Sequence, residues 1–118
     1  MASQSRKYRG YKTQDVVAQY FSEHGFPYAL STGAGRTGSD ITGVPFDVEV
    51  KATTRFEPKA NLDQLRARRS SSGELGFCVL RFNGQGEGSV GQYGVLFDLE
   101  SLVGVLSFLD EHGYFKKN

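Results

Sequence analysis

Two carboxylates and a lysine stand close together near the middle of the chain. Asp40 lies a short turn before the triplet Glu49-Val50-Lys51, in a stretch rich in strand-forming residues. Side chains alternate faces along a strand, so Asp47, Glu49 and Lys51 share one face. Burying such charges lowers the stability of the fold by roughly several kcal/mol unless a partner or a metal compensates them.

Two carboxylates with a lysine suit a hard divalent cation, because such cations prefer oxygen ligands and retain water molecules beside a phosphate. The stretch therefore predicts a site for metal-assisted cleavage of a phosphodiester bond. The structural alternative is an ordinary surface salt bridge between Glu49 and Lys51.

The elements that would position these residues follow from periodicity and turn signals. Apolar spacing and helix-stop glycines predict helices, and short apolar runs predict strands. The order α-β-β-β-α-β-β-α predicts one α/β domain with a mixed sheet flanked by helices. Polar residues 1–10 are expected to form a flexible basic arm, and glycine-rich residues 83–92 a mobile hairpin loop. The expected helices span 13–24, 61–69 and 99–111, and the strands 26–31, 40–41, 46–51, 76–82 and 93–97.

Charge is distributed unevenly along the 118 residues, although the formal net charge is only +1. Residues 1–72 carry eleven basic and seven acidic side chains, and residues 73–118 carry three and six. The basic half would attract a phosphate backbone, although ordinary surface scatter would also explain the count. The candidate DNA contacts are Arg6, Lys7, Arg9, Arg36, Arg55, Lys59, Arg66, Arg68 and Arg69.

Other classes of protein are disfavoured by the sequence. No apolar run approaches the roughly 20 residues needed to cross a bilayer, and the N-terminus lacks an apolar signal core, which predicts a cytoplasmic protein. Cys78 is the single cysteine and is expected to be a small buried hydrophobe. Residues 33–38 fit G-x-G-x-x-G, but the turn and proline at 43–45 leave no helix to meet a pyrophosphate, so no nucleotide cofactor is expected.

A family resemblance rests on Asp40, the triplet Glu49-Val50-Lys51 and the elements around them. The chain resembles the PD-(D/E)XK nuclease superfamily, with its restriction-endonuclease-like fold, and is most similar to archaeal-type Holliday junction resolvases and their phage relatives. The similarity covers roughly residues 9–82. It includes Arg9-Gly10, His24-Gly25-Phe26, the triplet continued by Ala52-Thr53, the helix at 61–69 and the strand at 77–82.

The resemblance implies a Mg²⁺- or Mn²⁺-dependent endonuclease. Asp40, Glu49 and the carbonyl of Val50 would bind the metal, and Lys51 would position or activate the attacking water. Ser31 stands where these resolvases have a loop hydroxyl near the scissile phosphate. Gln14 stands where they carry a metal-binding glutamate in the first helix.

The glutamine brings no charge to the metal, and Asp47 is a candidate to compensate because it shares a strand face with Glu49. The expected substrate is a four-way DNA junction. Its twofold symmetry predicts a homodimer, with the last helix or strand 93–97 as a candidate interface. The alternatives are a nuclease of the same fold that cuts flap, nicked or duplex DNA, and a non-catalytic DNA-binding module.

Overall fold

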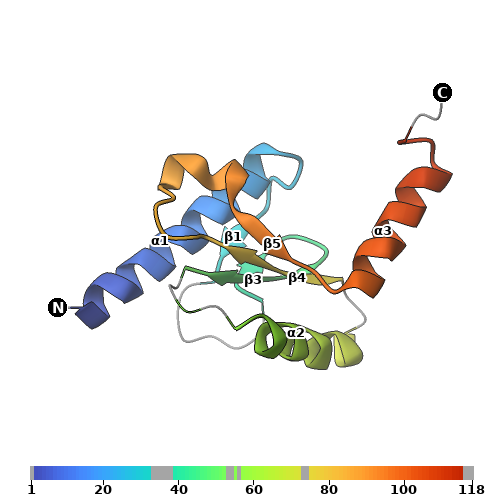
Figure 1. Cartoon of the computed structure of the whole chain (residues 1–118). Coiled ribbons are helices and arrows are strands. Elements are labelled where there is room, and N and C mark those ends of the chain that lie inside the picture. Colours follow the sequence, from blue (N-terminus) through green and yellow to red (C-terminus); the bar gives the residue numbers. More distant parts are fainter. Residues whose placement is uncertain (1, 33–38, 53–54, 56, 73–74, 116–118) are drawn as a thin grey trace.

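The computed structural model describes residues 2–32, 39–52, 55, 57–72 and 75–115, with side chains from residue 9 onward except those of 69–72. The chain forms α1 (Ala2–Glu23), β1 (Leu30–Ser31), β2 (Ile41–Thr42), β3 (Asp47–Lys51), α2 (Pro58–Ser72), β4 (Gly76–Leu80), the 3-10 helix η1 (Glu87–Gln92), β5 (Gly94–Leu96) and α3 (Leu99–Glu111) (Figure 1). The expected α/β class is confirmed. The restriction-endonuclease-like fold stays a prediction.

The main sheet has three strands in the order β3-β4-β5. β3 and β4 run parallel, with Glu49 beside Cys78, and β4 and β5 run antiparallel, with Val79 beside Val95. Parallel neighbours need a crossover connection, and α2 supplies it. The short antiparallel pair β1–β2 is linked to the main sheet where the amide of Asp40 donates to the carbonyl of Val48 at 2.7 Å.

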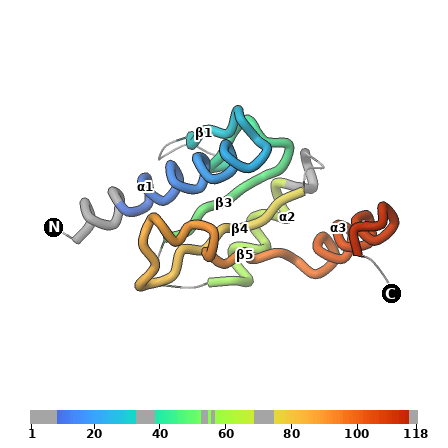
Figure 2. The backbone as a smooth tube through the Cα atoms, turned by 90° about the horizontal axis from the view of Figure 1, so that it is seen from above, coloured from blue at the N-terminus to red at the C-terminus, as the bar shows by residue number. Residues whose placement is uncertain are grey.

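Helices cover the two faces of this sheet. Val48 and Val50 of β3 pack in one core cluster with Val17 of α1. On the opposite face, Leu65 of α2 clusters with Cys78 of β4. Asp47, Glu49 and Lys51 alternate with the two valines, so they share the face that α2 covers (Figure 2). Cys78 has no exposed surface, which confirms its expected burial.

Helix α1 differs from the expectation because it begins at Ala2, so residues 2–10 continue the helix instead of lying outside it. Residues 2–12 contain no proline, and one glycine inside a helix costs only about 1 kcal/mol relative to alanine. A buried network also holds this part of α1 to the sheet. Arg81 donates to Thr13 Oγ1 at 2.9 Å, and Thr13 Oγ1 donates to the carbonyl of Arg9 at 2.6 Å.

Two connections are built from specific backbone geometry. Residues 83–92, expected to be only a loop, contain η1, whose last turn is joined to Gln85 by a bond from Gln85 Nε2 to the carbonyl of Gln92. Gly43 has φ +76°, and a Cβ there would lie 1.9 Å from the carbonyl oxygen of Tyr28. Only glycine therefore allows the turn that brings β2 and β3 together.

Helix α3 leaves the rest of the molecule and points away from it, as Figures 1 and 2 both show. The radius of gyration is 15.1 Å, and a compact chain of this length is expected near about 13.5 Å. None of the helices formed by the described residues combines the length and apolar character that a membrane span requires.

Candidate active site

Asp40 is held against β3 by its backbone and its side chain. Its Oδ2 accepts a hydrogen bond from the amide of Val50 at 2.8 Å, in addition to the backbone bond between Asp40 and Val48. Ser39 supports the same arrangement, because its Oγ accepts from the amide of Val48 at 2.9 Å. Asp40 therefore lies beside β3, although it belongs to the segment that enters β2.

The carboxyl group of Asp40 lies near that of Glu49, close enough for the charge of Glu49 to act on it. Burial, followed by the charge of Glu49, raises the pKa of Asp40 from 3.8 to about 6, against the opposing effects of the Val50 amide and of Lys51. Two neighbouring carboxylates repel each other when both are ionised, and a shared proton or a cation relieves that repulsion. The residues predicted from spacing are thus brought together as a pair.

Lys51 completes the predicted triplet. Its Nζ lies 3.6 Å from Glu49 Oε2, and its side chain is 35% exposed whereas that of Glu49 is only 8% exposed. The Glu49–Lys51 ion pair therefore exists, but its acid is buried under α2 instead of lying on the surface. The lysine is placed between this buried carboxylate and solvent, where it can meet an approaching phosphate.

Arg68 of α2 binds the charged face of β3, a role that the sequence reasoning missed. Its Nε and Nη2 donate to the two oxygens of Asp47, each at 2.7 Å, and its Nη1 donates to Glu49 Oε1 at 2.6 Å. These partners, which are charged, raise the pKa of the Arg68 guanidinium despite its burial. Asp47 is consequently engaged by an arginine and is not placed to replace a missing metal ligand.

A signal for Arg68 does exist in the sequence. Leu65 is buried against β4, and a residue three positions later lies on the same side of a helix. Arg68 therefore had to face the strand that carries Asp47 and Glu49 once α2 was known to cover it. The guanidinium is turned toward the sheet and binds two acids there, and its role as a DNA contact stays a prediction.

The remaining candidates for the site are Gln14 and Ser31. Gln14 Oε1 is shielded from solvent and has no hydrogen-bond partner among the described groups. Such an orphan oxygen is unusual and is commonly explained by a water or an ion. Ser31 pairs with Ile41, next to Asp40, and its Oγ donates to Asp15 Oδ1 at 2.7 Å. Its hydroxyl is thus bonded to α1 on the approach to the carboxylate pair.

The expected metal ligands can be tested against these contacts. Among the described residues, no group of three His, Cys, Asp or Glu side chains gathers as a metal site would. Asp40 and Glu49 still offer neighbouring carboxylate oxygens, which fits a Mg²⁺ ion that keeps several waters. Val50 contributes its amide to Asp40, and its side chain belongs to the core.

Of the expected DNA contacts, several have described positions on the surface. Arg9 Nη2 donates to the carbonyl of Phe82, Arg55 pairs with Glu57, and Lys59 pairs with Asp63. Arg66 is exposed on α2. Arg36 and the side chains of Arg6, Lys7 and Arg69 lie outside the described residues, as do residues 33–38 of the glycine motif. The described chain after that motif forms β2 instead of a helix.

Comparison of the chain with protein-family models, with curated proteins and with solved structures gave no significant match. The carboxylates of Asp40 and Glu49 and their surroundings are therefore the features from which a function can be inferred.

Proposed function

We propose that this chain is a Mg²⁺- or Mn²⁺-dependent endodeoxyribonuclease that resolves four-way or otherwise branched DNA. The observation that carries the proposal is the half-buried carboxyl of Asp40, held at β3 by the Val50 amide and lying near the buried carboxylate of Glu49, with Lys51 Nζ 3.6 Å from Glu49 Oε2. Neighbouring carboxylates are costly to keep ionised without a cation. A perturbed carboxyl pair beside an accessible lysine is typical of a catalytic site.

Each residue has a separate task in this proposal. Asp40 and Glu49 hold the metal through carboxylate oxygens, and the Val50 amide keeps Asp40 pointed at β3. Lys51 orients the attacking water or the scissile phosphate with its ammonium group. A bound Mg²⁺ supplies Lewis-acid activation and neutralises charge that develops on the phosphate. Arg68 fixes the rotamer of Glu49 from the other side.

The substrate proposal combines this site with the resemblance to junction resolvases. The exposed cations Arg55, Lys59 and Arg66 belong to the basic half of the chain, which suits a phosphate backbone. A junction has twofold symmetry, and two copies related by a twofold axis would place one site at each of two equivalent strands.

The test is cleavage of a labelled immobile four-way junction with Mg²⁺ or Mn²⁺, beside duplex, nicked, flap and single-stranded DNA. Asp40→Asn and Lys51→Met should each abolish cutting, whereas Asp63→Asn, which removes an exposed carboxylate, should cut normally. Paired symmetric nicks in the junction alone support the proposal. Equal cutting of every DNA would refute junction selectivity and retain a nuclease.

A second candidate is a non-catalytic DNA-binding module, and one observation favours it. Arg68 contacts Glu49 Oε1 and Lys51 lies near Glu49 Oε2, so two cations of the chain already compensate this acid. Calorimetric titration with Mg²⁺ and Ca²⁺ discriminates the two candidates. Binding that Asp40→Asn removes supports the nuclease, and tight junction binding without any metal binding or cutting supports the module.

A further inference from the structure

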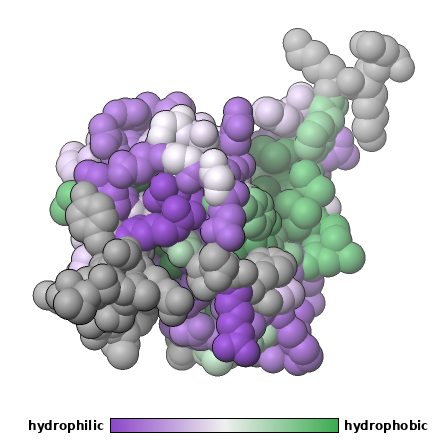
Figure 3. All heavy atoms as spheres, turned by 60° about the vertical axis from the view of Figure 1, so that its left-hand side comes forward, coloured by the Kyte–Doolittle hydropathy of each residue, from purple (hydrophilic) through white to green (hydrophobic). Residues whose placement is uncertain are grey.

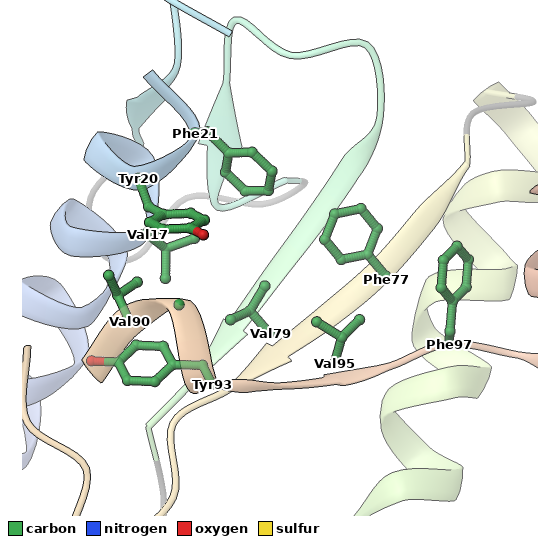
Figure 4. A pocket seen from close by; sticks show the side chains of 10 residues that line it. Val17, Tyr20, Phe21, Phe77, Val79, Val90, Tyr93, Val95 and Phe97 are labelled. Atoms are coloured by element: carbon green, nitrogen blue, oxygen red, sulfur yellow. The ribbon is translucent and has the colours of Figure 1, made fainter. Parts of the chain in front are cut away.

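The main sheet has an open strip beside α1. Three strands spaced about 4.8 Å apart place β3 and β5 about 10 Å from each other, and packed helices also lie about 8–10 Å apart. Because α1 packs over β3, the same face of β4 and β5 leaves room for one more helix. Phe77, Val79, Val95 and Phe97 line a cavity of about 310 Å³ on this strip, with Val17 of α1 as part of its wall (Figure 4).

This cavity is nearly entirely apolar, and its occupant must be apolar too. Val95 at its edge is 54% exposed. Figure 3 shows apolar side chains gathered toward one side of the molecule, at the right of that view. A contiguous apolar area of this kind on a small protein marks a site of association.

Helix α3 presents an apolar surface that suits the open strip. Leu99, Val103 and Leu106 recur at spacings of four and three residues, so they form one ridge along the helix. They are 74%, 48% and 40% exposed, which is unusual for the ridge of an amphipathic helix. We call them the α3 ridge. Of the three acidic side chains of α3, Glu100 and Glu111 lie beside the ridge, and Asp110 continues its line toward the end of the helix.

The junction between β5 and α3 directs the helix away from its own cavity. Asp98 caps α3, because its Oδ2 accepts from the amide of Ser101 at 3.0 Å. Both residues of this cap are buried, so the start of the helix is anchored in the body of the molecule. Figures 1 and 2 show α3 continuing outward from that anchor. The ridge is therefore presented to a second molecule and not to its own sheet.

We propose that two copies of this chain exchange α3, the ridge of each helix filling the open strip of the other copy. Charge and connectivity favour this occupant. Residues 99–111 carry three acidic and no basic side chains, whereas the rest of the chain carries fourteen basic and ten acidic ones. Helix α3 also follows directly after β5, whose Val95 lines the strip. The exchange is reciprocal, so it closes as a twofold dimer and leaves neither apolar surface exposed.

This inference deepens the proposed function by naming the surface of its dimer, and it rests on that function only for the expectation of twofold symmetry. The charged site of β3 faces α2, on the side of the sheet opposite to the strip. The dimer can accordingly be tested without DNA, metal or catalysis.

The first experiment measures mass by sedimentation equilibrium over a wide concentration range. The wild type should reach twice the chain mass of 13.0 kDa. Val103→Glu with Leu106→Glu places two charges on exposed ridge positions and should raise the dissociation constant about a hundredfold or more. The matched control is Gly104→Glu with Phe108→Glu, two charges at exposed positions about 100° or more around the same helix from every ridge residue, which should leave the dimer intact.

A second readout locates the contact. The chain has no tryptophan, so Phe97→Trp introduces a single fluorescent reporter into the strip. Its emission should shift to the red on dilution in parallel with the loss of mass, and should be red-shifted at every concentration in the ridge variant. This surface is wrong if the dimer survives the ridge substitutions, or if the emission of the Phe97→Trp variant does not change when the dimer dissociates. The exchange is wrong if the wild type is a monomer. A monomer whose Phe97→Trp variant has blue-shifted emission would show that the strip is covered by α3 of the same chain.

Discussion

At the scale of single residues, the spacing of Asp40 and Glu49 was informative because strand alternation and a tight turn limit where each side chain can point. The pairing of Arg68 with Asp47 and Glu49 was not predicted. It spans 21 and 19 residues, and it depends on the rotation of α2 about its axis. Residue type and spacing within a strand therefore identified the acids but not the base that holds them.

The raised pKa of Asp40 leads to a prediction about stability and pH. A carboxyl whose folded pKa lies near 6 and whose unfolded value is 3.8 stabilises the fold below the lower value, and this contribution is lost as pH rises through about 6. Asp40→Asn, which keeps an acceptor for the Val50 amide, should therefore raise the melting temperature above pH 6 by about 5 °C relative to wild type.

Thermal unfolding without divalent metal, on both sides of that pH, provides the measurement. Asp63→Asn serves as the control, because it removes an exposed carboxylate from α2 and should show no such gain. An Asp40→Asn variant that gains nothing above pH 6 would show that the carboxyl pair carries no electrostatic strain.

At the scale of elements, α2 both covers the charged face of β3 and neutralises it. The sequence located every helix and strand near its observed place, since apolar periodicity and glycine stops are local signals. It misplaced the start of α1 and missed η1. The early part of α1 is joined to the sheet by a bond between distant residues, Arg81 with Thr13, which no local window contains, and η1 is held by a side-chain bond from Gln85 that apolar periodicity does not signal.

Removing the Arg68 guanidinium should show how strongly the buried acids destabilise the fold when they lack a partner. Arg68→Met leaves Asp47 and Glu49 without their strongest partner and should lower the free energy of unfolding by about 3 kcal/mol. Arg66→Met on the same helix is the control and should change it by less than about 0.5 kcal/mol. Urea denaturation at neutral pH measures both.

Combining Arg68→Met with Asp47→Asn gives a sharper comparison. The double variant should lose less stability than the two single losses added together, because each single change leaves its partner uncompensated. Additive losses would mean that the two side chains contribute independently, contrary to their paired hydrogen bonds.

At the scale of the whole molecule, the α/β class followed from the alternation of helices and strands. The outward course of α3 did not, because its apolar ridge is equally compatible with packing inside the chain. What distinguishes the two outcomes is the buried Asp98 cap, a tertiary feature with no signature beyond an ordinary helix start.

Cys78 reports on the integrity of the whole fold. It lies on β4 between the layers, and burial, with the nearby Glu49 charge, raises the pKa of its thiol to about 12. Native protein should therefore resist iodoacetamide, and labelling should follow the same urea dependence as global unfolding. Ser107→Cys in a Cys78→Ala background, exposed on α3, should react at once. Fast labelling of native Cys78 would indicate local opening between α2 and β4.

Helix α2 is the connection between the parallel strands β3 and β4, and this has a consequence for how the chain can change during evolution. Connections between strands usually tolerate insertions, because doubling the length of a loop costs only about 0.6 kcal/mol. An insertion of one residue between Leu65 and Arg68 would instead rotate the guanidinium by about 100° away from the acids. The strand pairing could survive that change, but the charged face could not. Homologues should therefore vary in length before Pro58 or after Ser72, and keep the Leu65–Arg68 interval constant.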